Sequence, residues 1–289
     1  MRLLAALLLF TPLFAGAVQD RIAGFKGTVY LYAKNLDTGK TFGIRETDRV
    51  RTASTIKLPI MVAVFAAAEK GTLKWTEDLT LHDADKVSGS GVLHEFSDGV
   101  KLPIRDVMHL MIVLSDNTAT NLILDRITAD AVNTEMDRFG FKNIRSNRKI
   151  RGDGNKLKDP SGFSAAGRMP ENAKFGLGVA TPREMVLLLE KIEKGEAVSP
   201  AASKEILAVM KRQQDNDCIR RKFQNVMVAN KTGALDALRA DVGIVYSPKG
   251  RIAMAIYCDD MPQINYGPDN AGALLIADLA TMLVDELTR

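Results

Sequence analysis

The sequence contains few of the residues from which metal sites and nucleic-acid surfaces are built. Only three histidines occur among 289 residues, and none stands in an H-E-x-x-H spacing. They are His82, His94 and His109, which are scattered along the chain, so we expect no metal ion and no cofactor. The formal net charge is only +4 and no basic segment carries interleaved aromatic residues, so we expect no nucleic-acid partner.

Cysteine is also scarce, and its two positions leave the disulfide question open. Cys218 and Cys258 fit no metal-ligand spacing. In an oxidising compartment the two thiols would be able to pair. Two buried free thiols are equally compatible with the sequence, because an unpaired cysteine behaves as a small apolar residue.

The apolar stretch at the start of the chain is too short for a comfortable membrane span. It covers residues 3–14, whereas a spanning helix needs about 20 residues. Arg2 precedes it and the small-residue sequence A-G-A follows at 15–17, which is typical of a cleaved secretory signal. We therefore expect loss of residues 1–17 and a periplasmic or secreted protein with no membrane attachment. An uncleaved anchor is the alternative.

Segments typical of strands lie near both ends of the chain. Apolar residues make up 46% and charged residues 26% of the sequence, the balance of an ordinary globular protein. Two predicted hairpins pair residues 28–33 with 41–44 and residues 241–246 with 251–258. The final segment, 271–287, has the apolar spacing of a helix.

The middle of the chain has helical patterns. The predicted helices are residues 54–70, 102–114, 119–127, 182–192 and 200–213. These patterns predict an α/β (α+β) fold with an antiparallel sheet from 18–51 and 212–289, flanked by terminal helices, and an all-helical subdomain from 52–211. The irregular stretch at about 143–179 is long enough to suggest a functional loop.

The first chemical motif is S-x-x-K, formed by Ser54 and Lys57 at the start of a predicted helix. Residues three apart lie on one face of a helix, so the Lys57 amine is within reach of the Ser54 hydroxyl. A serine becomes a useful nucleophile when a neighbouring base takes its proton. A helix N-terminus also offers free N–H groups to a developing oxyanion. Alone, the motif is equally explained by a capping serine and a solvated lysine.

Two further tripeptides follow in the chain. Ser115-Asp116-Asn117 lies between two predicted helices, where S-D-N is also a reasonable helix cap. The apolar strand at 226–233 ends in K-T-G, and its Gly233 permits close approach of another backbone. Each tripeptide is common when taken alone, but S-x-x-K, S-D-N and K-T-G in this order form a combined signature.

With these three motifs in order, the chain resembles the class A β-lactamase family over nearly its whole length past the signal. The resemblance implies that Ser54 is the nucleophile and that Lys57 is its general base or proton relay. It implies that Ser115 passes a proton to the leaving nitrogen. Asn117 would bind the substrate's side-chain amide and steady Lys57. Backbone N–H groups of Ser54 and Ala234 would form the oxyanion hole.

The resemblance also implies a site for an anionic substrate. Lys231, counted among the catalytic residues, and Thr232 would anchor the substrate carboxylate, with Gly233 and Ala234 lining the same strand. Arg239 would add to this carboxylate site, although its register is one residue away from the commonest family arginine. The alternative for Arg239 is a surface salt bridge to Asp241.

The sequence departs from the family at the residue that supports release of the acyl group. Class A enzymes carry a glutamate there, in an E-x-x-L-N pattern, which activates the deacylating water. Ile150 falls at that position, and isoleucine accepts no proton. Glu171 is the leading substitute, followed by Asp153 and Asp159, and a solvated loop acid is the alternative for each.

These observations favour a β-lactamase-like serine hydrolase that opens β-lactam amides through a Ser54 acyl-enzyme. The alternatives are a D-alanyl peptidase or esterase acting on cell-wall peptides, and a slowly deacylating penicillin-binding protein or sensor. An inactive scaffold is disfavoured because all three motifs are intact. We expect a small β-lactam or cell-wall peptide as the substrate, and a monomeric protein.

Overall fold

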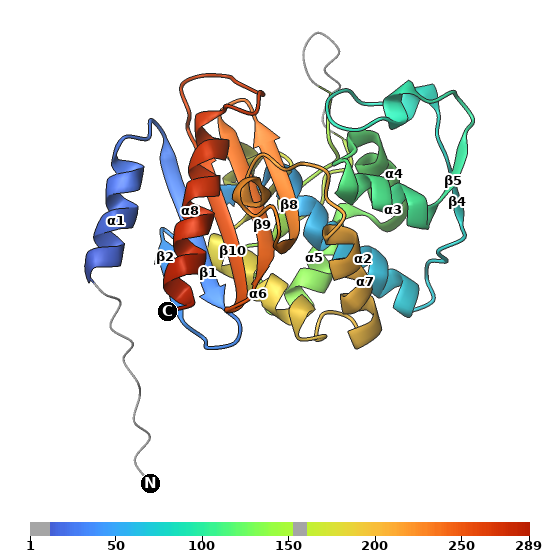
Figure 1. Ribbon diagram of the computed structural model, residues 1–289. Helices are drawn as coiled ribbons and strands as arrows, with labels where there is room; N and C mark the ends of the chain where they lie inside the picture. The colour runs from blue at the N-terminus through green and yellow to red at the C-terminus, as the bar shows by residue number, and fades with distance from the viewer. Residues whose placement is uncertain (1–11, 153–160) are drawn as a thin grey trace.

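The fold is built around one antiparallel sheet. A computed structural model describes residues 12–152 and 161–289. Five strands lie in the order β2-β1-β10-β9-β8, and neighbouring strands run antiparallel (Figure 1). They span Thr28–Asn35 (β1), Thr41–Ile44 (β2), Met227–Leu235 (β8), Leu238–Ser247 (β9) and Gly250–Asp259 (β10). The predicted α+β class with its antiparallel sheet is confirmed.

The strands β9 and β10 are buried along most of their length because helices cover both faces of the sheet. The first eight residues of β9 and the last eight of β10 are buried. Ser247 pairs with Gly250 across the hairpin between them, at the turn that the S-P-K-G sequence predicts. β9 begins at Leu238, before the predicted start at 241, because Leu238 and Arg239 already pair with β8.

One face of the sheet is covered by the C-terminal helix. Helix α8 (Ala271–Leu287) packs against β9 and β10, and α1 (Pro12–Ala23) lies along its outer side (Figure 1). Val18 is buried in this layer, and Arg21 forms an ion pair with Asp278 of α8. The predicted cleavage point after residue 17 falls within α1, and the cleavage itself stays a prediction.

The opposite face carries α6 and, beyond it, the other helices. Helix α6 (Pro182–Glu193) packs on β1 and β10 and begins with the predicted cap, in which Thr181 Oγ1 accepts from Glu184 N. The remaining long helices are α2 (Lys57–Glu69), α3 (Ile104–Val113), α4 (Asn117–Ile127), α5 (Ala129–Arg138) and α7 (Pro200–Met210). Within 12–152 and 161–289, no helix is long and apolar enough to cross a membrane.

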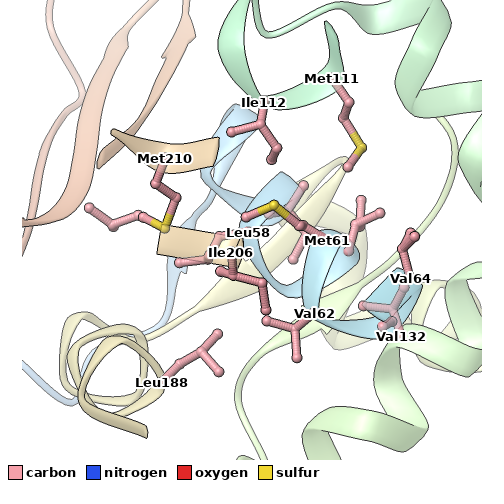
Figure 2. Packing of buried hydrophobic residues seen from close by; sticks show 14 of the residues in the cluster. Leu58, Met61, Val62, Val64, Met111, Ile112, Val132, Leu188, Ile206 and Met210 are labelled. Atoms are coloured by element: carbon pink, nitrogen blue, oxygen red, sulfur yellow. The ribbon is translucent and has the colours of Figure 1, made fainter. Parts of the chain in front are cut away.

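Helix α2 runs through the centre of the larger hydrophobic cluster. Its residues are buried without interruption from Lys57 to Ala66, as expected for a helix that is apolar on every side. Figure 2 shows Leu58, Met61 and Val62 among side chains of the surrounding helices. The neighbours include Met111 and Ile112 of α3, Val132 of α5, Leu188 of α6, and Ile206 and Met210 of α7. This packing fixes the N-terminus of α2 in space.

The segment predicted to be all-helical also contains short strands. β4 (Asp78–Thr80) pairs with β5 (Lys101–Pro103), so the helix predicted from residue 102 begins only at Ile104. Pro103 is extended, with ψ 146°, which delays the helix. β7 (Gly178–Ala180) joins β3 (Val50–Arg51) and β6 (Arg145–Ser146) in a second small sheet.

Candidate active site

Ser54 lies in a short 3₁₀ turn, η1 (Ala53–Ile56), that leads directly into α2. The predicted helix over 54–70 is thus divided between this turn and α2. Ser54 is partly exposed, whereas its neighbours in the turn are buried. Ala53 has φ +45°, a left-handed conformation that is costly for a residue with a side chain. The turn therefore presents the Ser54 hydroxyl at the head of a rigid helix.

Lys57 is fully buried one turn further along. Its Nζ donates to Ser115 O at 2.7 Å, to Asn117 Oδ1 at 2.9 Å and to Ser115 Oγ at 3.3 Å. Burial lowers the pKa of Lys57 well below its ordinary value, and the nearby charge of Lys231 lowers it further against the opposing effect of Asp116. A buried lysine with a lowered pKa is able to serve as a base near neutral pH.

The S-D-N tripeptide is held by its aspartate. Asp116 caps α4 by accepting from Ala119 N at 2.8 Å, and its other oxygen accepts from Val92 N and Leu93 N at 2.7 and 2.9 Å. Ser115, directly before it, has φ +56°. Because Asp116 is fixed by three backbone donors, the flanking Ser115 and Asn117 are held facing Lys57.

The K-T-G strand completes the cluster from the sheet side. Lys231 is fully buried on β8, and its Nζ donates to Ser115 Oγ at 3.0 Å and to Thr232 O at 2.8 Å. Burial lowers the pKa of Lys231 to about 8, although Asp215 and Asp241 oppose the shift. The Ser115 hydroxyl therefore lies between two lysine amines, an arrangement suited to passing a proton.

Gly233 sets the distance between β8 and the serine turn. A Cβ at Gly233 would lie 2.9 Å from Thr52 O, 3.1 Å from Thr55 Cγ2 and 3.2 Å from Ala53 Cβ. A residue with a side chain would push the strand away from the serine turn. Thr232 is buried and Ala234 is exposed, so the strand emerges at the surface just past Gly233.

Ile150 is held at a defined place beside α4. Its backbone N donates to Asn121 Oδ1 at 2.8 Å, and its carbonyl accepts from Asn121 Nδ2 at 2.8 Å. Asn121 lies four residues after Asn117, hence on the same face of α4. Sequence reasoning did not identify Asn121, and this helical spacing is the signal that points to it. The aliphatic side chain of Ile150 offers no atom that accepts a proton.

Glu171, the leading substitute for the missing glutamate, makes no described contact with this cluster. Glu171 is exposed on η6 (Pro170–Phe175) and lines a surface hollow with Asp48 and Arg49. Among the contacts of the described residues, none joins Glu171 to Ser54 or Lys57. Asp153 and Asp159 lie outside the described residues.

Arg239 is buried and bound to backbone carbonyls, and its predicted role in a carboxylate site stays a prediction. Its side chain is only 6% exposed, so it is not a surface residue. Its guanidinium donates to the carbonyls of Leu235, Leu238 and Asn265. The predicted alternative of a salt bridge to Asp241 is wrong, because Asp241 binds Asn230 Nδ2 and Ile219 N instead.

A buried polar group lies behind the K-T-G strand. Asn230 precedes Lys231, donates to both oxygens of Asp241 at 3.1 and 3.0 Å, and accepts from Arg220 Nε at 2.8 Å. Burial raises the pKa of Asp241 to about 7, against the lowering effect of its hydrogen bonds. The two cysteines lie in the same layer, where both are buried and unpaired. Burial raises the pKa of Cys218 and Cys258.

Comparison with known proteins matches the chain to β-lactamases and to PBP-A. The family described as "Beta-lactamase enzyme family" matches residues 13–287. A β-lactamase structure from Sphaerobacter thermophilus is 31% identical, with a TM-score of 0.81 over 95% of this chain and 96% of that chain. PBP-A is 28% identical, with a TM-score of 0.77 over 95% of each chain. Beta-lactamase L2 of Stenotrophomonas maltophilia is 25% identical over 81% of this chain and 72% of its own length.

Proposed function

The chain belongs to the β-lactamase family of serine hydrolases, and from that premise we propose that β-lactams acylate Ser54 and that the acyl group is released slowly. The observation that carries the second half of this proposal is Ile150, whose backbone is bound on both sides by Asn121. The first half rests on the hydrogen-bonded cluster of Lys57, Ser115 and Lys231.

Acylation follows from the charges of this cluster. Lys57 in its neutral form takes the proton of Ser54, and Ser54 Oγ bonds to the carbonyl carbon of the lactam. The oxyanion that forms would be stabilised by backbone N–H groups of Ser54 and Ala234. The amide C–N bond then breaks, and Ser115 gives its proton to the leaving nitrogen. Ser115 recovers a proton from the lysines on either side of its hydroxyl.

The substrate class follows from the second lysine. Lys231 has a pKa of about 8 and is therefore mostly cationic at neutral pH. It lies in the middle of β8, three residues before the strand reaches the surface at Ala234. The adjacent Thr232 would bind the carboxylate of a β-lactam or of a C-terminal D-alanyl peptide. A cation buried at this depth favours an anionic substrate because little water screens it.

Release of the acyl group requires a base that activates water, and Ile150 supplies none. A positioned general base typically contributes about 10²–10⁴-fold to a rate. The acyl-enzyme should therefore persist. A leucine-to-glutamate mutant of PBP-A, 28% identical to this chain, is known in an acyl-enzyme complex with penicillin G, which supports acylation chemistry for this scaffold.

We place the protein outside the cytoplasm, in a periplasm-like space or secreted. The support is the N-terminal sequence, with Arg2, the apolar residues 3–14 and the A-G-A site at 15–17. Cell-wall peptides and penicillins are both met in that compartment.

Covalent labelling by a fluorescent penicillin tests the proposal. The wild-type protein should carry one label, and Ser54→Ala should carry none. Ser247→Ala, in the turn at the far end of the sheet, serves as the matched serine control and should label normally. Labelling of Ser54→Ala at another residue would contradict the assignment of the nucleophile.

A second candidate function is a peptidase or esterase acting on cell-wall peptides. It is favoured by Lys231, whose buried cation would suit the C-terminal carboxylate of such a peptide. Incubation with a D-alanyl-D-alanine peptide and with a neutral ester separates the two. Peptide turnover without labelling by penicillin would select this candidate.

A further inference from the structure

We propose that Arg239 and Tyr266 form a clamp on the β8–β9 turn, and that this clamp positions the backbone N–H of Ala234 beside Ser54. The clamp is defined by these two side chains, and the turn by Asp236 and Ala237. The catalytic meaning of the clamp rests on the function proposed above. In this account Arg239 is a positioning residue and not a ligand of the substrate carboxylate.

The β8–β9 turn has a geometry that needs support. Leu235 pairs with Leu238, so only Asp236 and Ala237 connect the strands. Two-residue hairpin loops favour turns with positive φ, because those match the twist of the paired strands. Both connecting residues lie in the described part of the chain, and neither has a positive φ. The turn is therefore not of the favoured type, and contacts from outside must help to hold it.

Four contacts supply that support. Arg239 Nη1 donates to Leu235 O and Leu238 O, both at 2.7 Å, and so binds the two carbonyls that flank the turn. The Tyr266 hydroxyl donates to Asp236 Oδ1 at 2.7 Å. The backbone of the loop after β10 also participates, because Met261 N donates to Ala237 O at 3.1 Å.

The two halves of the clamp also hold each other. Arg239 Nη2 donates to Asn265 O, directly before Tyr266. The guanidinium carbon of Arg239 lies 4.7 Å from the centre of the Tyr266 ring, within the range of a cation–π contact. The loop after β10 and the β8–β9 turn are thereby joined into one unit.

These contacts leave Arg239 poorly placed to bind a substrate. The side chain is 6% exposed, and three backbone carbonyls already accept from its terminal nitrogens. Three of its five N–H donors are bound to carbonyls, and the low exposure of the side chain leaves a carboxylate little access to the other two. The buried positive charge of Arg239 is stabilised by the carbonyl dipoles that it binds.

Ala234 lies between two fixed points. On one side, Gly233 packs against the turn that carries Ser54. On the other side, the carbonyl of Leu235 is bound by the clamp, and Ala234 itself is the strand partner of Arg239. The Ala234 N–H is therefore held at a set height above Ser54. Loss of the clamp would leave the backbone at Leu235 free to move.

Two variants and a control test the clamp. Arg239→Gln removes the charge and most of the carbonyl contacts. Tyr266→Phe removes the hydroxyl contact of an exposed residue and should leave the fold intact. Arg251→Gln is the matched control, because Arg251 binds Asp37 and Glu193 near the opposite end of the same sheet.

The first readout is amide hydrogen exchange of a peptide covering residues 232–239. Exchange should be faster in Arg239→Gln and, to a smaller degree, in Tyr266→Phe, and unchanged in the Arg251→Gln control. This measurement needs no catalytic activity, so it decides on the clamp even if the proposed function fails. Unchanged exchange in both clamp variants would overturn the inference.

The second readout is the acylation rate with a penicillin and with a neutral ester that has no carboxylate. Removal of an oxyanion-hole donor typically costs about 10²–10³-fold, so its displacement in Arg239→Gln should slow both substrates by about tenfold or more. Both should slow by the same factor, with the dissociation constant of the non-covalent penicillin complex unchanged. A loss confined to the penicillin would overturn the inference and make Arg239 a carboxylate ligand. Absence of acylation in the wild type would instead count against the proposed function.

Discussion

Two buried amines share the hydroxyl of Ser115 at the centre of the site. Lys57 and Lys231 are both fully buried, and each lies within hydrogen-bonding distance of Ser115 Oγ. Two full positive charges at this separation and burial disfavour each other, so one amine is driven to its neutral form. The effect is stronger on Lys57, whose pKa is lowered well below that of an ordinary lysine. This difference supports the proposed roles of Lys57 as the base and Lys231 as the cation.

Substitution of Lys57 by arginine separates the positive charge of the side chain from its ability to accept a proton. Arginine keeps the positive charge but is not deprotonated in proteins, so it is unable to take the Ser54 proton. Lys57→Arg should slow acylation by about 10²–10⁴-fold, the usual contribution of a general base. Rates of adduct formation by mass spectrometry provide the measurement. Lys70→Arg, at the opposite end of α2, is the control, and an arginine variant as fast as wild type would refute the role.

In the proposed function, Ile150 is the residue that would limit release of the acyl group. Asn121 binds only the backbone of Ile150, so a new side chain there should keep its place. Ile150→Glu should accelerate deacylation by about 10²–10⁴-fold, because it supplies a general base. Ile150→Gln has a similar shape without the base and should release the acyl group as slowly as wild type. Equal rates in the two variants would show that proton acceptance at this position is not limiting.

At the scale of elements, the site depends on close contact between β8 and the serine turn. Gly233→Ala places a Cβ 2.9 Å from the backbone oxygen of Thr52. Overpacking of this kind typically costs about 1–3 kcal/mol, and the strand should move away from Ser54 and slow acylation. Thermal unfolding and adduct formation measure the two effects. Gly24→Ala is the control, because its Cβ would meet nothing within 4 Å. A similar result for both variants would contradict the close-contact account.

The elements were largely predictable where local signals decide them. The hairpin around residues 247–250 and the closing helix follow from turn residues and from apolar spacing, and both appear at the predicted places. Pro103 shows the limit of such signals, because pairing with β4 keeps it in a strand although the helical pattern begins at 102. Helix α5 was not predicted, since its sequence is mostly polar and it is held by packing against α2, α4 and β6.

The residues of the candidate site were predictable from the sequence, but most of their contacts were not. Three motifs name Ser54, Lys57, Ser115 and Lys231, and the structure brings the last three into direct contact. The partners of Arg239 were not predictable, because they come from a loop and a turn that meet only in three dimensions. The doubly bound Ile150 likewise depends on how the segment after α5 returns to α4.

At the scale of the whole molecule, buried ionisable groups make stability depend on pH. The pKa of Asp241 is raised to about 7 in the fold from an ordinary value of 3.8, so the folded state holds this proton more tightly than the unfolded state. Stability should therefore fall as pH rises from about 4 to 7. The lowered pKa of Lys231, about 8, has the opposite consequence, and stability should rise between pH 8 and 10.5.

Asp241→Asn isolates the acidic part of this dependence. The amide is isosteric and can still accept from Ile219 N, but it does not titrate. In the wild type, the raised pKa of Asp241 should lower the free energy of unfolding by about 4 kcal/mol at most between pH 4 and 7. The variant should not show this decline. Denaturant unfolding at several pH values measures it. A decline that persists in Asp241→Asn would assign the titration to another group.

The persistence of the Ser54 acyl-enzyme is the central claim, and intact-mass spectrometry of the protein after mixing with penicillin G tests it most directly. The adduct should appear rapidly and in full, because Lys57, Ser115 and Lys231 are assembled for acylation. It should then decay far more slowly than it formed, because Ile150 cannot activate water. Rapid consumption of penicillin with no accumulating adduct would contradict the account.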